Sequence, residues 1–376
     1  MKRKLIFGAV FLVMIVCTIL WVRSTITDGG VSTTENDSFD MYTDFPHNIS
    51  LMGEGIIVED GLLRYPFRVR QLGGYIYVLD FHGEDNFCHI FDEKDYSHIA
   101  SFANRGNGPE DVLQAMDMYV VNKDSIWLFD TDKREVTLWG YNEHEKVVVR
   151  KKAYRMKEDM ILSANCTWYS DSVYYFTDKS GNNRVLKCNK DGIVTERIGS
   201  IPSRKPNKRI DNGILAQAWN GYIKCNPLKQ ILVVASQLGD VIEIYNSKEG
   251  TRHVLYGPQG EPVYEISPNG FAIPSGIMGY SDLEITDRYI YAVFHGRSFK
   301  DIIKDPQGTP DGGEYIHIYD FKGNPICRLI LDHAIYGIDV DEENGIIWAT
   351  DVNSEEQIIK YLIPDLMCVN KTINEI

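Results

Sequence analysis

The amino-acid sequence predicts an all-β fold built from six copies of one repeat. Each copy is a short β-branched or aromatic run entered from a polar or glycine-containing turn, a pattern typical of a buried strand. The first copy is Gly74–Asp80 and the last is Gly345–Thr350. A period of this length indicates a radial or stacked repeat. Equivalent positions lie 47 to 59 residues apart, at Ile76, Ile126, Val173, Ile231, Ile290 and Ile346.

Each repeat is predicted to contain four strands separated by polar turns. Four antiparallel strands make one propeller blade, so six repeats predict a six-bladed β-propeller. A ring leaves open edges unless both ends of the chain share a blade. We therefore expect Ile49–Glu59 to add a closing strand to the last blade, which ends near Leu362. The second repeat shows its strands most clearly, at Leu113–Val121, Ser125–Asp130, Glu135–Tyr141 and Lys146–Lys152.

The sequence predicts that the propeller, residues 45–376, is preceded by an N-terminal transmembrane or signal helix within residues 1–23. Lys2–Lys4 is followed by Leu5–Val22, eighteen residues without a charge. A helix of that length rises about 27 Å, enough to cross a hydrocarbon core. The charge bias places the N-terminus in the cytoplasm and the propeller on the periplasmic or extracellular side. Residues 24–44, rich in Ser, Thr, Asp, Gly and Asn, predict a flexible linker.

Three interpretations of this N-terminal segment lead to export of the main body. The pattern favours an uncleaved signal anchor, with residues 5–22 in the membrane. A lipoprotein acylated at Cys17 and a cleaved signal peptide are the alternatives. The residues before Cys17 lack the small side chain usual in a lipoprotein signal, and no A-x-A-like cleavage site follows the apolar run.

The charge of the chain argues against nucleic-acid binding and shows two local basic clusters. The net charge of −14 argues against nucleic acid as a partner. Basic residues cluster at Lys146–Lys157 and at Arg204–Arg209. We interpret both clusters as solvated loop or edge faces, with contact to an anion or an anionic lipid as the alternative.

Two long insertions near the fifth blade, Gly257–Gly279 and Lys300–Gly313, are candidate binding loops.

The sequence carries no motif for nucleophilic, nucleotide or zinc chemistry, so no catalytic residue is predicted. The six cysteines after Cys17 form no C-x-x-C pair and are interpreted mainly as buried hydrophobic residues on strands. Aspartates that end second strands are expected to cap tight turns. These aspartates are Asp80, Asp130 and Asp351.

Two segments resemble known propeller families. Ile335–Asp341 followed by Gly345–Asp351 is similar to an NHL-type blade, in which an I-x-V-D run precedes an apolar strand ending in Asp. Arg105–Glu110 resembles the Gly- and Pro-rich turn between blades one and two of TolB-like six-bladed propellers. The resemblance covers roughly residues 50–365 and implies an exported protein of the Bacteroidetes-type cell envelope. It specifies the fold well and the activity poorly.

In a propeller the first strand of each blade lines the central channel, so polar residues on these strands are the candidate ligand-binding residues. Their carboxylates, amides and single guanidinium would suit a small polar ligand, or a calcium ion as the alternative. Six-bladed lactonase-like hydrolases, which the fold resembles, use a metal in the channel to activate water. Solvated channel lining is the simpler interpretation. The six residues are Arg68, Asp117, Asn165, Asn220, Asp282 and Asp339.

The turn at Arg105, Gly106 and Gly108 could present backbone N–H groups to an anion. Pro109 removes one donor, so a structural turn between blades is the favoured interpretation. Taken together, the sequence predicts a membrane-tethered binding or interaction module of the bacterial envelope, whose partner is an unknown protein or a small polar ligand. No cofactor is expected. A calcium-dependent lactonase or ester hydrolase that uses the channel is the alternative.

Overall fold

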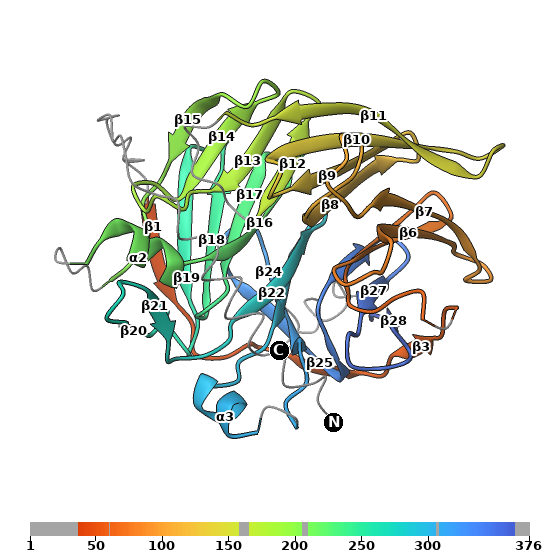
Figure 1. Cartoon of the computed structure of the whole chain (residues 1–376). Helices are drawn as coiled ribbons and strands as arrows, with labels where there is room; N and C mark the ends of the chain where they lie inside the picture. The colour runs from red at the N-terminus through yellow and green to blue at the C-terminus, as the bar shows by residue number, and fades with distance from the viewer. Residues whose placement is uncertain (1–36, 60, 158–164, 205–209, 306–307, 365–376) are drawn as a thin grey trace.

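The computed structural model describes residues 37–59, 61–157, 165–204, 210–305 and 308–364. These residues form a six-bladed β-propeller whose blades follow one another around a common axis (Figure 1). Each of the six sequence markers lies in the second strand of its blade, so the predicted repeat is confirmed. The helix predicted within residues 1–23 lies outside the described residues. Among the residues described, no helix is both long and apolar enough to span a bilayer.

Within each blade the strands pair antiparallel in chain order, from the axis to the rim. The boundaries predicted for the second repeat agree with the observed strands to within three residues. Blade 1 is β4 (Pro66–Leu72), β5 (Tyr75–Asp80), β6 (Asn86–Asp92) and β7 (His98–Asn104); blade 2 is β8 (Ala115–Asn122), β9 (Ser125–Asp130), β10 (Glu135–Asn142) and β11 (Val147–Arg155); blade 3 is β12 (Cys166–Ser170), β13 (Val173–Thr177), β14 (Val185–Asn189) and β15 (Val194–Ile198).

The second half of the ring repeats this order with longer connections. Blade 4 is β16 (Gly221–Asn226), β17 (Ile231–Ser236), β18 (Val241–Asn246) and β19 (Thr251–Tyr256); blade 5 is β22 (Tyr280–Ile285), β23 (Ile290–Phe294), β24 (Gly313–Tyr319) and β25 (Pro325–Ile335); blade 6 is β26 (Ile338–Asp341), β27 (Ile346–Thr350) and β28 (Ile358–Leu362), to which a strand from the N-terminal side is added.

Residues 37–56, which we call the strap, run along the rims of blades 4, 5 and 6. β1 (Asp37–Met41) pairs parallel with β19, and β2 (Asn48–Leu51) pairs parallel with β25. β3 (Glu54–Ile56) pairs antiparallel with β28 and closes the ring, so the closing strand predicted over Ile49–Glu59 is confirmed in its second half. Its first half is corrected, because Ile49–Leu51 pairs with blade 5. In Figure 1 β1 lies beside β19, on the side of blade 4 away from the axis.

The strap corrects two expectations. The linker predicted over residues 24–44 includes a strand, β1, and the part before Asp37 lies outside the described residues. Blades 4 and 5 contain five strands instead of the predicted four. Local patterns did not show this, because β1 and β2 find their partners about 200 to 300 residues away in the chain.

The hydrophobic core lies between the blades. Alternating residues of each strand point to opposite faces of the blade, so both faces are buried against neighbouring blades. One cluster of buried residues occupies each of the six interfaces. Trp348 and Ile56, for example, pack with Val69 and Val78 where blade 6 meets blade 1. The ring is therefore closed by packing as well as by β3.

A buried polar cluster anchors the strap to blades 4 and 5. The Tyr42 hydroxyl lies 2.8 Å from that of Tyr319, and it donates to Asp240 at 3.3 Å. Tyr280 donates to the same Asp240 oxygen at 2.8 Å. Burial raises the pKa of Asp240, while these hydrogen bonds and one from Gln259 oppose the rise. Because Asp240 and Tyr280 lie on different blades, this cluster fastens both blades and the strap at one point.

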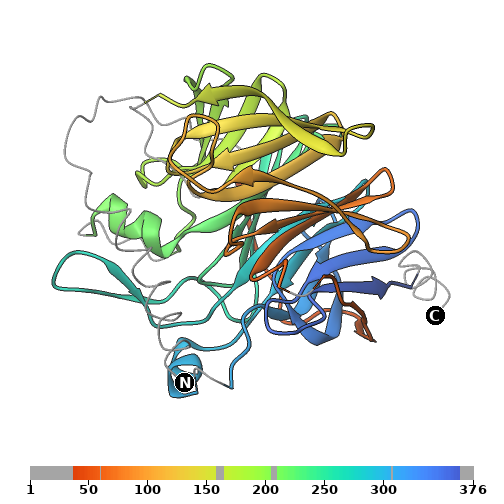
Figure 2. The ribbon, with the colours of Figure 1, turned by 45° about the vertical axis from the view of Figure 1, so that its right-hand side comes forward.

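The two insertions flank blade 5, as predicted. The first contains the hairpin of β20 (Tyr264–Ile266) and β21 (Ala272–Pro274), and the second contains all but the first residue of α3 (Phe299–Lys304). The Phe299 N–H donates to the Gly276 carbonyl at 3.0 Å and so joins the two insertions. Figure 2 shows both on the same side of the ring as α2 (Asn212–Ala218), which precedes blade 4. The described cysteines are all buried, namely Cys88, Cys166, Cys188, Cys225 and Cys327.

Candidate functional site

Strand alternation places charged side chains at the ring axis. In β4 the register shifts between Pro66 and Arg68, and beyond this shift Val69 enters the core between blades 6 and 1. Arg68 and Arg70 both lie on the other face of the strand, where they meet Asp282 and Glu284 of blade 5 near the axis. In β22, Leu283 lies in the core between blades 4 and 5, while Asp282 and Glu284 point to the axis. The resulting axial ring comes from five of the six first strands. It consists of Arg68, Arg70, Asp117, Lys224, Asp282, Glu284 and Asp339.

Arg68 and Asp282 form the first layer of this ring. Arg68 Nε lies 3.7 Å from Asp282 Oδ1, and both side chains are almost fully buried. Asp282 also accepts from the Ile338 N–H at 3.1 Å. The guanidinium carbon lies 5.2 Å from the centre of the Tyr222 ring, a cation–π contact. Burial alone would lower the pKa of Arg68, but Asp282 and then Asp117 outweigh it and the pKa is raised.

Arg70, Glu284 and Asp339 form the second layer. Arg70 Nη2 lies 3.6 Å from Glu284 Oε2, and its Nη1 donates to the Ile338 carbonyl at 2.7 Å. Asp339 Oδ2 accepts from the Gln71 N–H at 2.7 Å. Burial raises the pKa of Asp339 to about 6, with Arg70 opposing the rise and Glu284 adding to it. Asp339 keeps some solvent contact, although protein atoms surround its carboxylate.

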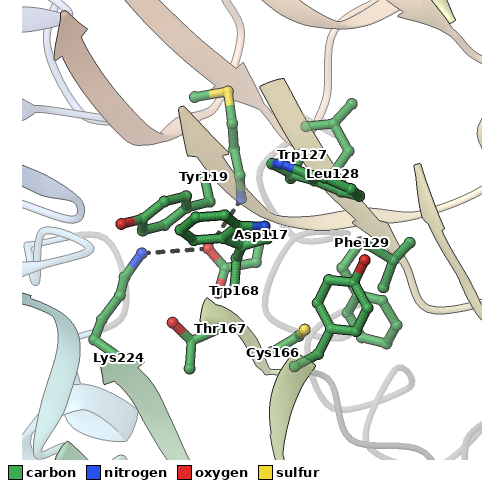
Figure 3. A pocket seen from close by; sticks show the side chains of 12 residues that line it. Asp117, Tyr119, Trp127, Leu128, Phe129, Cys166, Thr167, Trp168 and Lys224 are labelled. Carbon is green, nitrogen blue, oxygen red and sulfur yellow. Dashed lines mark hydrogen bonds and ion pairs between the residues drawn. The ribbon is translucent and has the colours of Figure 1, made fainter. Parts of the chain in front are cut away.

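Asp117 and Lys224 complete the ring from blades 2 and 4. Lys224 Nζ lies 3.5 Å from Asp117 Oδ1, as the dashed line in Figure 3 shows. Tyr119 and Trp168 stack beside this pair with ring centres 4.8 Å apart. The adjoining cavity measures about 20 Å³. It has room for about one water molecule, so it is too small for an organic ligand.

The structure brings four of the six predicted channel residues to the axis and leaves two outside the ring. Asn165 is buried and donates from Nδ2 to the Gly221 carbonyl at 2.9 Å. Asn220 accepts from Lys179 Nζ at 2.5 Å and donates to Gln237 Oε1 at 2.6 Å. Burial, and then the charge of Arg184, lowers the pKa of Lys179 to about 8. Asn165 and Asn220 therefore belong to connections between blades.

Sequence reasoning missed three members of the ring, although a signal for two of them was present. Arg70 and Glu284 lie two residues after Arg68 and Asp282, and period-two alternation sends both members of each pair to the same face. Lys224 carried no comparable signal, because no other polar channel residue had been identified on β16. Its role depends on Asp117 from a blade more than 100 residues away.

The donor set in the channel does not favour the calcium alternative. Asp282 and Asp117 each face a cationic side chain, and Asp339 already accepts a backbone hydrogen bond. Among the described residues, no three His, Cys, Asp or Glu side chains come together in a way that could hold a metal ion. Nothing in this arrangement supports the hydrolase interpretation.

The turn at Arg105–Gly108 binds groups of its own chain. The Gly108 N–H donates to Asp111 Oδ2 at 2.9 Å, and the Gly106 N–H donates to the Val112 carbonyl at 3.2 Å. Arg105 packs over the Phe87 ring and donates to the Phe81 carbonyl. Because Asp111 already occupies the position of an anion, this geometry favours the structural turn over the anion site.

The aspartates that end second strands do cap turns, as predicted. Asp80 accepts backbone N–H groups of Arg64, Tyr65 and His82. Asp130 accepts four such groups, and Asp351 accepts the N–H of Asn353. In blades 1 and 2 each carboxylate thereby ties the loop that enters the blade to the loop after its second strand.

Comparisons with known proteins agree with this architecture. The family model described as TolB-like 6-blade propeller-like matches residues 44–343. No curated protein sequence matches the chain. A solved structure of a Bacteroides fragilis NCTC 9343 protein described as exported aligns with a TM-score of 0.54 and 12% identity, over 86% of this chain and 99% of that one.

Two further solved structures are similar at lower scores. A streptogramin B lyase aligns with a TM-score of 0.45 and 12% identity, over 83% of this chain and 96% of the lyase. BamB from Moraxella catarrhalis aligns with a TM-score of 0.38 and 11% identity, over 80% of this chain and 84% of BamB. The family match spans well over half of the chain and five complete blades of the observed ring. This chain therefore belongs to the TolB-like six-bladed propeller family.

Proposed function

We propose that the protein is an exported, membrane-tethered binding module of the bacterial envelope, which binds the ammonium group of a small polar ligand at the solvent-exposed carboxylates of its axial ring, outside the small cavity beside Asp117. Its family and the similar exported Bacteroides fragilis protein support export. The apolar segment at residues 5–22 would supply the tether. The propeller would act as a rigid scaffold that holds the axial ring in place, without catalysis.

The observation that carries the proposed ligand is the exposure of the carboxylates in the axial ring. Four carboxylates face three cations, which leaves the ring with one unbalanced negative charge. The Glu284 side chain is 20% exposed, while its partner Arg70 is 7% exposed. Asp117 is 12% exposed and Lys224 5%. A ligand that enters the channel therefore meets carboxylate oxygens before it meets the cationic groups.

Asp339 adds a second argument, because holding its charge in the channel costs stability. Its pKa of about 6 means that the fold favours the neutral carboxyl, chiefly because of burial. Titratable groups with such shifts are enriched at functional sites. An ammonium group beside Asp339 would favour its ionised form, and binding would then offset the cost.

Asp339→Asn is expected to raise the free energy of unfolding by about 1–2 kcal/mol at pH 7.5. The folded protein keeps the Asp339 proton up to about pH 6, whereas the unfolded chain releases it near 3.8. The stability of the wild type therefore falls as the pH rises between these values and is level above them. The gain in the variant should vanish towards pH 4. Urea unfolding of the wild type and the variant between pH 4 and 7.5 measures this difference in stability, with the exposed Asp40→Asn as the control. If the wild type and Asp339→Asn are equally stable at every pH, the raised pKa of Asp339 is contradicted.

Ligand binding is tested by thermal unfolding with a diamine (1,4-diaminobutane), L-lysine, succinate and glycerol. We expect only the two ammonium compounds to raise the Tm. At about 100 times its Kd a ligand adds roughly 2.7 kcal/mol of stability. Glu284→Gln and Asp339→Asn should abolish the shift, while the exposed Glu265→Gln on β20 should keep it. A shift with succinate alone, or one that survives both channel variants, would overturn the proposal.

A further inference from the structure

The six blades differ in whether another strand pairs with the outer strand of their own four or three. The strap covers the outer strands of blades 4 and 5 and supplies the outer strand of blade 6. Among the described residues, β7, β11 and β15 each end their sheet with no strand beyond them. An uncovered outer strand presents unpaired backbone N–H and C=O groups, which can pair with an extended peptide. Three blades therefore offer an edge of the kind that the strap already occupies elsewhere.

The strap shows how such an edge is recognised in this ring. β1 and β2 are extended segments added in parallel to already complete four-stranded blades. Each addition pairs acidic and basic side chains. Asp37 Oδ2 lies 3.2 Å from Arg252 Nη1 of β19, and Asp44 Oδ1 lies 3.4 Å from Arg328 Nη2 of β25. In both cases a carboxylate of the strap meets an arginine of the outer strand, from β1 itself for Asp37 and from the connection before β2 for Asp44.

β11 is the uncovered edge that repeats this basic character. It has nine residues, against seven in β7 and five in β15, and most of its residues are exposed. Lys152 and Arg155 on β11 form no ion pair with any residue that the structure describes. Arg150 and Lys151 are paired with Glu135 and Asp124. Figure 1 shows β11 at the outer margin of blade 2.

Beside β11 lies a groove that could take a side chain of a bound segment. It has a volume of about 230 Å³ and runs between β11 and β7. Phe102 and Trp139 form its apolar floor, and Val149 on β11, 49% exposed, lies at its rim. Lys152 and Arg155 are three residues apart on β11 and point to opposite faces, so this edge, with its exposed valine and adjoining groove, suits a strand that carries acidic residues on both faces together with apolar residues.

We propose that the outer edge of β11 binds an acidic, extended segment of a partner protein, which becomes a fifth strand of blade 2. Lysine on an edge strand discourages pairing with neutral or basic strands, because burying an unpaired ammonium against them is unfavourable. The same charges select an acidic segment. This site is independent of the channel, since it lies at the rim of a blade and shares no residue with the axial ring.

Fluorescence anisotropy of the full chain in detergent tests the proposal, with a labelled nine-residue peptide of three Glu-Glu-Val repeats, which carries carboxylates on both faces of a strand. We expect saturable binding that weakens with salt. The double variant Lys152→Glu with Arg155→Glu should weaken binding at least tenfold. Lys190→Glu with Lys248→Glu, which changes the net charge equally on the exposed turns of blades 3 and 4, should leave it unchanged. An unaltered Tm in both variants confirms that the fold is intact.

Two further arms separate strand addition from other modes of attraction. A peptide N-methylated at alternate residues keeps its charge but loses backbone donors, and we expect it to bind at least tenfold more weakly. If the N-methylated and the unmodified peptide bind equally well, backbone hydrogen bonds do not contribute and the attraction is due to charge alone. That result would overturn the proposal. Phosphatidylglycerol vesicles form the last arm. Binding of vesicles but not of the peptide, lost in the β11 variant, would assign this edge to a membrane surface instead.

Discussion

Replacing Glu243 with glutamine is expected to lower the free energy of unfolding by about 3–5 kcal/mol at pH 7. The Glu243 side chain is fully buried. Its Oε1 accepts from Arg184 Nε at 2.6 Å, and its Oε2 accepts from Arg252 Nη2 at 2.7 Å. Glutamine keeps the shape but leaves two buried guanidinium groups without this charge, and breaking a buried ion pair from one side is strongly destabilising.

The effect of Glu243→Gln should depend on pH with a definite sign. Burial alone would raise the pKa of Glu243, but Arg184 and Arg252 outweigh it and the pKa is lowered. A carboxylate with a lowered pKa stabilises the fold above the usual value of 4.5, and this contribution is lost as the pH falls further. Urea unfolding of the wild type and Glu243→Gln at pH 7 and below pH 4 measures how far the loss of stability shrinks as the pH falls. The exposed Glu249→Gln is the control, and a loss below about 1 kcal/mol at pH 7 would contradict the buried triad.

Removing the strap is expected to abolish cooperative unfolding. A chain that begins at Ile57 lacks the buried side chains of Tyr42, Phe45, Leu51 and Ile56. Each contributes about 1.5–3 kcal/mol by burial, or roughly 6–12 kcal/mol together. This amount is comparable with the whole stability of a typical protein, about 5–15 kcal/mol. It would also expose the rims of three blades and the partners of Tyr42 in the cluster around Asp240.

A truncation series tests the strap, with the chain that begins at Asp37 as the reference. Circular dichroism and size-exclusion chromatography report folding and aggregation. A chain that begins at Gly53 keeps β3 and should retain a cooperative but lowered transition, because ring closure survives without β1 and β2. If the chain that begins at Ile57 melts within a few degrees of the reference, the strap contributes little and the closure argument is wrong.

The number of blades and their order were predictable because they depend on local sequence. Each second strand, such as Ser125–Asp130, is buried on both faces and must read as a short apolar run. Turn residues between the runs set where each strand ends. The closing strand was predictable as well, since a ring with an unpaired final blade would expose an edge. The parallel strand β1 was not predictable, because its mostly exposed side chains carry no strand pattern and its partner is distant. For β2 the sequence indicated a strand from Ile49, but not its partner in blade 5, which lies about 280 residues away.

The axial ring was only partly predictable, for a different physical reason. Reading polar residues on first strands identified Arg68, Asp117, Asp282 and Asp339. Asn165 and Asn220 were chosen by the same rule, but each precedes its strand by one residue and bonds away from the ring, Asn165 to Gly221 and Asn220 to Gln237. An error of one residue changes the direction of a side chain, and strand boundaries are uncertain by more than that.

Local chemistry in the chain was sufficient for the all-β class, the six repeats, the capping aspartates and the closing strand. Each of these depends on residues within a few positions of one another, or on the requirement that no edge of the ring stay open. Tertiary structure was needed to pair Asp117 with Lys224, to bury Glu243 between two arginines and to leave β11 uncovered. Such contacts join blades that are far apart in the chain, and their energies depend on burial and distance, which arise only when the ring closes.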